Sequence, residues 1–161
     1  MVILVDLKKM AGDSIAINAD DIVMIEMYKE YYPDGKLKLA GGLDNGVKSG
    51  IFREYDREGK IINGYIYKQD TLIAEGIIEG NGIFQGAWKT YFKGTRQIES
   101  EGEYVDGAKE GKWIFYYPNG KKEQEGNYDK NKLSGQWKWY YANGKLKRQE
   151  YYNRNEQLSG T

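Results

Sequence analysis

The sequence predicts an all-β chain, an elongated antiparallel meander of consecutive β-hairpins with about eleven short strands and a short N-terminal lead-in. Three observations support this fold class. A segment recurs with a period of 24 residues, turn residues recur every 11 to 13 residues, and β-branched and aromatic residues alternate with polar ones between the turns. Because glycine interrupts the chain so often, long helices are disfavoured.

The repeat is clearest in the second half of the chain. The unit that opens at Gly111 reads GKWIFYYPNGKKEQEGNY, and the unit that opens at Gly135 reads GQWKWYYANGKLKRQEYY. Related units open at Gly86, where the spacing to the next unit is 25 residues, and at Gly50, where Phe52 stands in place of tryptophan. Similarity at a fixed period predicts a repeat array in which each unit packs on its neighbours.

Proline, asparagine and glycine mark the hairpin tips. Pro33-Asp34-Gly35 suits a tip, because proline presets φ to about −65° for a type I turn and glycine accepts the left-handed conformation that closes it. Gln69-Asp70 adds a turn that makes residues 72–83 an extra hairpin arm instead of a long loop. The turn glycines predicted at the tips are Gly35, Gly59, Gly94, Gly120 and Gly144. Further turns are predicted at residues 44–46, 80–82, 106–107, 130–131 and 153–155.

We divide the chain into a lead-in or cap over residues 1–30 and a hairpin array over residues 31–161, which together form one domain. Within the lead-in, strands are the preferred interpretation, because isoleucine and valine dominate its apolar runs. An alternative is a short helix that Asp20 caps and that continues through Tyr28. The candidate strands cover residues 2–7, 14–18 and 22–27.

Composition excludes several classes of site. The chain has no cysteine and no histidine, so disulfides, thiolate nucleophiles and zinc sites of the Cys/His type are excluded. Basic and acidic residues both number 24, which removes the bulk electrostatic argument for nucleic-acid binding. The net charge is −4 over residues 1–80 and +4 over residues 81–161, a mild asymmetry that indicates solvated surface.

The first residues carry no clear targeting signal. Residues 1–7 form a short apolar run without a basic start or a small-residue cleavage site, and no stretch approaches the roughly 18 apolar residues of a membrane span. The compartment therefore stays open: cytoplasmic, or secreted if a leader was removed.

The repeated aromatic residues are interpreted as the core of a thin sheet. Side chains alternate along a strand, so Trp113, Phe115 and Tyr117 are predicted on one face and Ile114 and Tyr116 on the other. A ligand-binding aromatic platform is the minority interpretation. Trp137 is expected to be less enclosed than Trp113, because only a short tail follows its repeat. The repeat aromatics are Phe52, Tyr55, Trp88, Tyr91, Trp113, Tyr116, Trp137 and Tyr140, and the glycines expected beside the rings are Gly76, Gly102 and Gly126.

Candidate chemistry is sparse. Acidic residues are predicted to alternate onto one face, and paired carboxylates do acid/base work in glycosidases, but pairing with lysine on an exposed face is the favoured interpretation. These residues are Glu99, Glu101 and Glu103, then Glu123 and Glu125. The sequence has no P-loop, no G-x-S-x-G elbow and no kinase H-R-D or D-F-G element. We therefore expect no catalytic, cofactor-binding or metal-binding residue, and no enzyme activity.

The units of the form G-x-W-x-x-Y-Y-x-N-G-K-x-x-x-E-G-x-Y resemble the MORN-variant repeats that are common in bacterial proteins, and the resemblance covers about residues 31–161. It implies a single elongated sheet of hairpins with a binding or scaffolding role, and some bacterial relatives look like antitoxin or immunity components. MORN repeats also precede the catalytic domain of plant phosphatidylinositol phosphate kinases. A kinase name given to this chain would rest on the repeats alone, since the kinase motifs are absent.

A non-enzymatic array predicts a binding surface. The leading hypothesis is a protein-interaction module whose sheet face or open edge binds an unidentified protein partner, with no nucleic acid and no small-molecule substrate expected. The second hypothesis is a lipid or phosphoinositide module at a membrane surface. An enzyme acting on carbohydrate or phosphate is the least favoured. The basic residues that motivate the lipid hypothesis are Lys121, Lys122, Lys145, Lys147 and Arg148.

Overall fold

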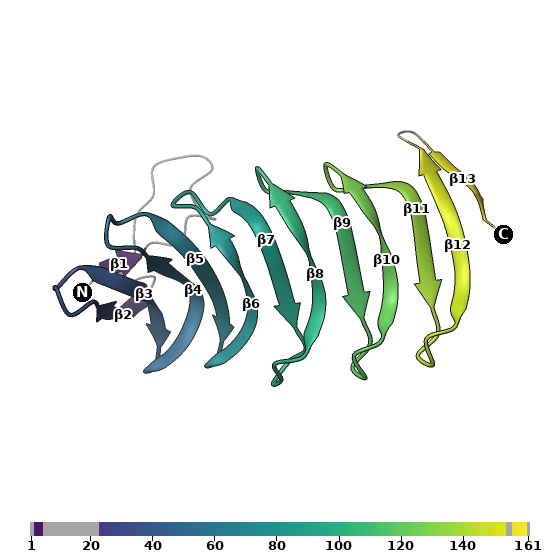
Figure 1. Ribbon diagram of the computed structural model, residues 1–161. Coiled ribbons are helices and arrows are strands. Elements are labelled where there is room, and N and C mark those ends of the chain that lie inside the picture. Colours follow the sequence, from purple (N-terminus) through teal and green to yellow (C-terminus); the bar gives the residue numbers. More distant parts are fainter. Residues whose placement is uncertain (1, 5–22, 154–155, 161) are drawn as a thin grey trace, which may run out of the picture.

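The chain forms a single antiparallel sheet. A computed structural model describes residues 2–4, 23–153 and 156–160 and, among them, the side chains of residues 26–153. Thirteen strands lie side by side in sequence order, and the described residues include no helix, hence none that could span a membrane (Figure 1). The predicted all-β meander of hairpins is confirmed.

The strands follow the predicted turns. Eleven of them, β3 to β13, fall within the predicted array, and the extra arm expected over residues 72–83 is β6. The strands are β1 (Val2–Leu4), β2 (Val23–Tyr31), β3 (Leu37–Asp44), β4 (Val47–Tyr55), β5 (Ile61–Lys68), β6 (Thr71–Ile78), β7 (Phe84–Tyr91), β8 (Ile98–Val105), β9 (Ala108–Tyr116), β10 (Lys122–Asp129), β11 (Lys132–Tyr140), β12 (Leu146–Asn153) and β13 (Glu156–Gly160).

The lead-in contributes two strands, β1 and β2. β2 pairs with both β1 and β3, so it joins the lead-in directly to the array and crosses the boundary predicted after residue 30. The helix alternative is wrong from Val23 onwards, because these residues extend and pair with the neighbouring strands. The strand predicted at residues 14–18 lies outside the described residues.

Two kinds of turn connect the strands from β2 to β12. Two-residue turns, such as Asn45-Gly46 and Lys130-Asn131, use positive φ at both residues. Wider turns are closed by pairs of backbone hydrogen bonds, as between Tyr117 and both Gly120 and Lys121. The predicted turn glycines all lie in wide turns at positive φ, with values of 84° at Gly35, 81° at Gly59, 75° at Gly94, 79° at Gly120 and 90° at Gly144.

Between β2 and β12, wide and two-residue turns alternate except around β7. There, two wide turns follow each other, at residues 79–83 and 92–97. Before β7 the wide turns lie at one end of the strands, and after it they lie at the opposite end (Figure 1). The strands of the later units therefore run in the opposite direction while their order across the sheet continues unchanged. All the hairpin units have the same handedness. A unit whose strands run in the opposite direction, with the strand order unchanged, therefore presents its equivalent side chains on the other face of the sheet.

The aromatic residues consequently change face at β6. We name the two sides of the sheet by what they carry over β6–β12: the tryptophan face, with Trp88, Trp113 and Trp137, and the carboxylate face, with Glu75, Glu101 and Glu125. Directly opposed cross-strand partners share a face. Phe52 pairs with Tyr65, which pairs with Glu75, so Phe52 lies on the carboxylate face.

Isoleucine and alanine replace aromatic rings at β6, where the aromatic residues change face; we call this place the crossing. Ile66 pairs with Ala74, and Ala74 pairs with Thr90, two residues after Trp88, so all of them share the tryptophan face. Ala74 and Ile78 are buried and Ile66 packs against them. The sequence aligns Phe52 with Trp88, but the structure separates them onto opposite sides.

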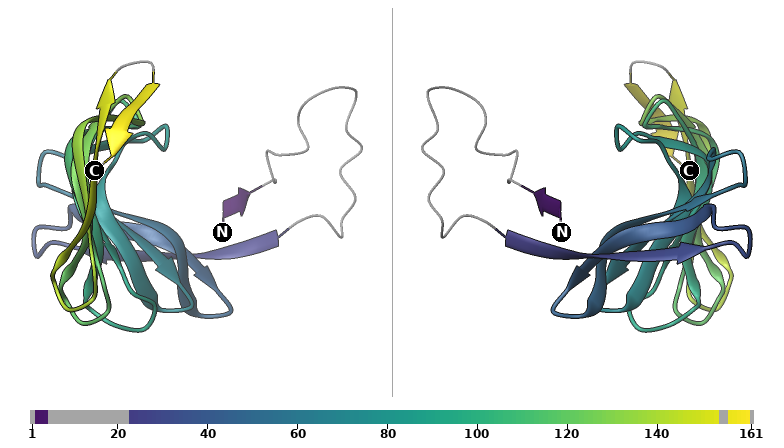
Figure 2. Two further views of the ribbon diagram at one scale, coloured as in Figure 1. Left: turned by 90° about the vertical axis from the view of Figure 1, so that its right-hand side faces the viewer. Right: turned by 90° about the vertical axis from the view of Figure 1, so that its left-hand side faces the viewer.

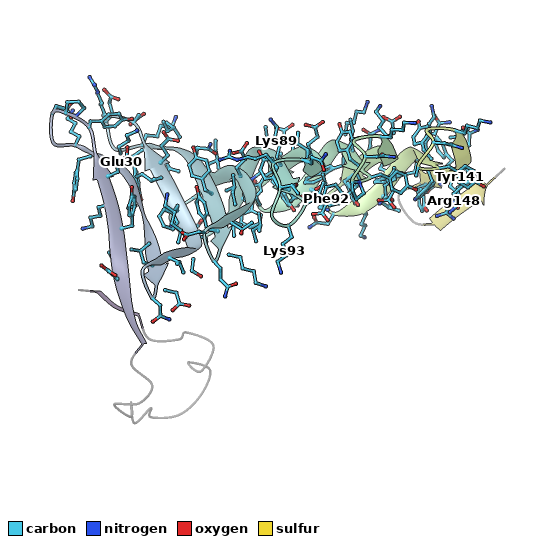
Figure 3. All side chains as sticks on the ribbon, turned by 90° about the horizontal axis from the view of Figure 1, so that it is seen from below. Glu30, Lys89, Phe92, Lys93, Tyr141 and Arg148 are labelled. Atoms are coloured by element: carbon cyan, nitrogen blue, oxygen red, sulfur yellow. The ribbon has the colours of Figure 1, made fainter. Side chains whose placement is uncertain are left out.

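The sheet is curved. Figure 2 shows that the strands bow along their length, so the sheet has a trough-like cross-section. Side chains stand on both sides of the one layer of strands in Figure 3. The buried hydrophobic side chains of the described residues are therefore few and form a thin line: Phe52, Leu72, Ala74, Ile78, Trp88, Trp113 and Trp137.

Candidate interaction surfaces

The tryptophans form the core of the second half of the array. Trp88, Trp113 and Trp137 are 3%, 2% and 1% exposed. Each indole covers a glycine of the preceding strand, at a point where a Cβ atom would overlap the ring. These glycines are Gly76, Gly102 and Gly126, the three that the sequence predicts beside the rings.

Hydrogen bonds and neighbouring rings hold two of the indoles in place. Trp113 Nε1 donates to the Glu103 carbonyl at 3.1 Å, and Trp137 Nε1 donates to the Asn127 carbonyl at 2.9 Å. Tyr128 lies edge-on to Trp137 with ring centroids 5.1 Å apart. Trp88 Nε1 is buried without a hydrogen-bond partner among the described residues.

Trp137 is as enclosed as Trp113, so the expectation that it is less enclosed is wrong. The reason is local. Tyr128 of β10 covers one side of the ring, and Trp139 of its own strand lies 6.0 Å away between ring centroids. A following repeat is therefore not needed to bury this indole.

The rings that remain accessible on the tryptophan face surround the indoles. They are only partly buried, whereas the indoles are closed to a ligand. Ring contacts connect Trp88 to Tyr104, Tyr104 to Trp113, and Trp113 to Tyr128 in one line along the sheet. The partly exposed rings are Phe84, Tyr104, Phe115, Tyr128 and Trp139.

On the carboxylate face, the second set of repeat aromatics donates to carboxylates. Tyr91 donates to Glu75 at 2.6 Å, Tyr116 to Glu101 at 2.5 Å, and Tyr140 to Glu125 at 2.7 Å. Burial, with the neighbouring carboxylate, raises the pKa of each of these tyrosines to about 12. They are neutral donors at physiological pH.

Glu125 is held by two lysines as well as by Tyr140. Lys122 Nζ lies 2.9 Å and Lys112 Nζ 3.4 Å from Glu125 Oε2. The hydrogen bond from Lys122 is the main reason why the pKa of Glu125 is lowered to about 2. This pairing agrees with the structural interpretation of the acidic residues.

A bulge changes the predicted grouping of the other glutamates. An extra residue at Glu99 shifts the register between β7 and β8, and the Glu99 carboxylate lies 3.4 Å from Thr90 Oγ1, beside Ser100. Glu99 and Glu101 therefore do not share one face. No group of acidic residues in the described part of the chain has an arrangement that could hold a metal ion.

Phe52 and Tyr55 belong to the first half of the array. Phe52 is fully buried over Gly41 on the carboxylate face, with Tyr67 edge-on at 5.1 Å. The Tyr55 carbonyl accepts a 2.8 Å hydrogen bond from the Tyr32 hydroxyl. Tyr117 and the Tyr140 carbonyl make the same contact in the second half, so wide turns of successive units are joined in both halves.

A polar hollow of about 280 Å³ lies on the carboxylate face near the crossing. Glu30, Glu54 and Glu75 line it, and each already accepts a hydrogen bond, from Lys38, Tyr65 and Tyr91 respectively. The hollow is open and its carboxylates are satisfied within the chain. It does not have the convergent free groups of an active site.

Two lysines lie among aromatic rings. Lys109 Nζ is 4.4 Å from the ring centroid of Trp113 and 5.2 Å from those of Phe115 and Tyr128. Lys48 Nζ, on the carboxylate face, lies between 5.0 and 5.3 Å from Tyr28, Phe52 and Tyr67. Sequence reasoning missed both, although each lysine stands four residues before the Phe52 or Trp113 of its unit.

The basic residues of the C-terminal half are largely engaged within the chain. Lys121 donates to the Asn143 carbonyl, Lys122 to Glu125, and Arg148 to Glu150. The Arg148 guanidinium also stacks 4.1 Å from the Trp139 ring centroid. Lys147 lies 5.6 Å from the ring of Tyr141, and both are exposed.

Comparison with known families agrees with the repeat. A family model for the MORN repeat variant matches residues 27–41, 109–130 and 133–154. These segments are therefore similar to MORN-variant repeats. They lie on both sides of the crossing at β6, in β2–β3 and in β9–β12. A search of curated proteins gave no match to the chain.

The row of buried tryptophans ends in the last matched segment, residues 133–154. Glu150 occupies the position that Gly126 holds one repeat earlier, and its side chain is buried against Arg148 and Tyr152, which donate to it at 2.8 and 2.6 Å. A Cβ at this position leaves no room for a further indole. The MORN-variant pattern thus predicts the Trp-on-Gly contact, and Glu150 marks the point where it stops.

Proposed function

We propose that the chain is a non-catalytic scaffold that binds a protein partner on its tryptophan face. MORN-variant repeats are consistent with a scaffold, and no ordered set of catalytic groups lies in the described residues. An antitoxin-like or immunity-like role, which the resemblance to bacterial repeat proteins implies, is one form that such binding takes.

One observation carries the proposal: the partly exposed rings of the tryptophan face have no second layer over them among the described residues. A sheet normally buries its apolar side against another layer. An exposed aromatic surface bounded by polar residues is typical of a protein interface. On the opposite side, carboxylates, tyrosines and lysines satisfy one another, which leaves fewer groups for a partner.

Site-specific photo-crosslinking in the native host tests the proposal. A photoreactive benzoylphenylalanine replaces Gln124, which pairs with Phe115 on the tryptophan face, and the control replaces Lys112, which is exposed on the opposite face. We expect a discrete protein adduct from position 124 and little from position 112. Equal yields from both positions, or none from position 124, would contradict the assignment to this face.

A lipid-binding function is the second candidate, because one exposed group favours it. Tyr141 and Leu146 are about half exposed at the last wide turn, and Lys145 and Lys147 lie beside them. Aromatic, apolar and cationic side chains together suit a membrane surface. Against it, three of the five basic residues that suggested lipid binding are paired within the chain.

Flotation with vesicles that contain phosphatidylserine separates the two candidates. A lipid module should float at low salt, lose binding as salt rises, and lose it again when Lys145 and Lys147 are both replaced by glutamine. If the parent protein stays at the bottom of the gradient at low salt, the lipid candidate fails and the protein-binding proposal is unaffected.

A further inference from the structure

Lys109 is a cation with no counterion among the described residues, and it is held among uncharged rings. Its main chain is fixed, because Lys109 N donates to Asn131 Oδ1 at 2.7 Å and Asn131 N donates to the Lys109 carbonyl at 3.0 Å. No ion pair of the described residues includes Lys109. Burial alone lowers the pKa of its ammonium group, which indicates that no charged neighbour offsets the loss of solvent.

Packing does not require a lysine here. The equivalent position, four residues before the tryptophan, holds Phe84 before Trp88 and Leu133 before Trp137. Phe84 fills the place well, with its ring centroid 4.2 Å from that of Trp88. An apolar side chain therefore serves the fold, and a lysine adds the cost of desolvating a charge.

Lys48 offers a comparison within the same molecule. It lies among three rings at similar distances, but its charge also acts on Glu30. The pKa of Glu30 is lowered first by Lys38 and, to a smaller extent, by Lys48. The cation at Lys48 thus has a carboxylate in its surroundings. The cation at Lys109 has only rings around it among the described residues, and the residue is partly exposed.

We propose that Lys109 anchors an acidic segment of the protein partner, by pairing its ammonium group with a carboxylate of that segment. This inference rests on the proposed function and names the chemistry of the partner. The rings of Tyr104, Phe115 and Tyr128 would pack against the apolar part of the same segment. A desolvated cation is also where one added carboxylate contributes most, because the local dielectric is low.

A membrane is a poorer fit to this site. Attraction to anionic lipids is built from several basic residues, each contributing about 1 kcal/mol near the surface. Lys109 stands alone among uncharged rings, so it suits one carboxylate on a shaped partner better than a plane of headgroups.

The test uses the crosslinker at position 124 in three further backgrounds. Lys109→Met keeps the approximate length and packing of the side chain and removes its charge, whereas Lys109→Arg keeps the positive charge. Lys89→Met removes an exposed lysine of the carboxylate face and is the matched control. Melting temperatures within a degree or two of the parent establish that the variants fold.

We expect the adduct yield to fall at least tenfold in Lys109→Met, to recover to within about threefold of the parent in Lys109→Arg, and to stay within twofold in Lys89→Met. Full adduct yield in Lys109→Met would overturn this inference and leave the proposed function intact, whereas absence of an adduct in the parent contradicts the proposed function itself. If Lys109→Met instead abolishes flotation with phosphatidylserine vesicles while the adduct persists, the anion is a lipid and the inference is wrong.

Discussion

The indole of Trp113 lies against Gly102 of the preceding strand, so close that a Cβ on this glycine would overlap the ring. The same relationship joins Trp137 to Gly126 and Trp88 to Gly76. In a sheet of one layer there is little other apolar contact, so we expect stability to depend strongly on both members of each pair.

Gly102→Ala should destabilise the protein by about 1–3 kcal/mol, because the added methyl group forces the indole or the backbone to move. Gly80→Ala is the matched control. Gly80 is exposed in a wide turn, and a Cβ there meets nothing within 4 Å. Its cost should stay within about 0.5 kcal/mol. Urea unfolding of the two variants measures both, and equal costs would mean that Gly102 is not a contact glycine.

Trp113→Ala and Trp137→Ala should both be costly, each by roughly 3–5 kcal/mol, the usual range for emptying a large aromatic site. Both rings are almost completely buried and both indole nitrogens donate a hydrogen bond. Denaturant melts with unchanged m-values provide the comparison. A small loss for Trp137→Ala alone would show that the end of the array is looser than its neighbours.

Acid should remove part of the stability through Glu125. Its folded-state pKa, about 2, lies below the ordinary value of 4.5 for a glutamate. The contribution of the ion pairs is therefore complete above about pH 4.5 and is lost as the pH falls towards 2. Glu125→Gln should lower the free energy of unfolding at pH 7 and flatten its decline over that window. Glu123→Gln, from the same strand, should leave the slope of the parent unchanged; if it flattens the slope equally, Glu125 is not the responsible group.

Alkali should act through the tyrosines of the carboxylate face. The pKa of Tyr140 is raised from 10.0 to about 12, first by burial and then by the hydrogen bond to Glu125. Stability from the neutral hydroxyl is complete below pH 10 and is lost as the pH rises towards 12. Tyr140→Phe should reduce this loss, whereas Tyr141→Phe, at an exposed neighbouring ring, should not. Unfolding measured between pH 9 and 12 tests the difference.

Local features of this fold were predictable from the sequence because their causes are local. The positive φ of a turn glycine and the lack of a Cβ beside a large ring are both visible as glycine at a fixed repeat position. The direction of side chains within one strand also followed, with Trp113 and Phe115 together and Tyr116 opposite.

Three features depended on relations that a linear pattern does not contain. The wide turn at residues 79–83 resembles the others in composition, yet it reverses the strands after it and moves the rings to the other face. The enclosure of Trp137 comes from Tyr128 and Trp139, not from a following unit. The ring contacts of Lys109 come from two strands, β9 and β10, and become visible only when these are paired.

The change of face at β6 is the central claim of this account, since it defines which side of the sheet carries the exposed rings. Aromatic-to-methyl nuclear Overhauser effects on the intact protein measure it most directly. We predict cross-peaks from the Phe52 ring to Tyr67 on the carboxylate face, and from the Trp88 ring to the methyl group of Ala74, the partner of Ile66, on the tryptophan face. Cross-peaks from the Phe52 ring to the Ile66 methyl groups would place both on one face and contradict the account.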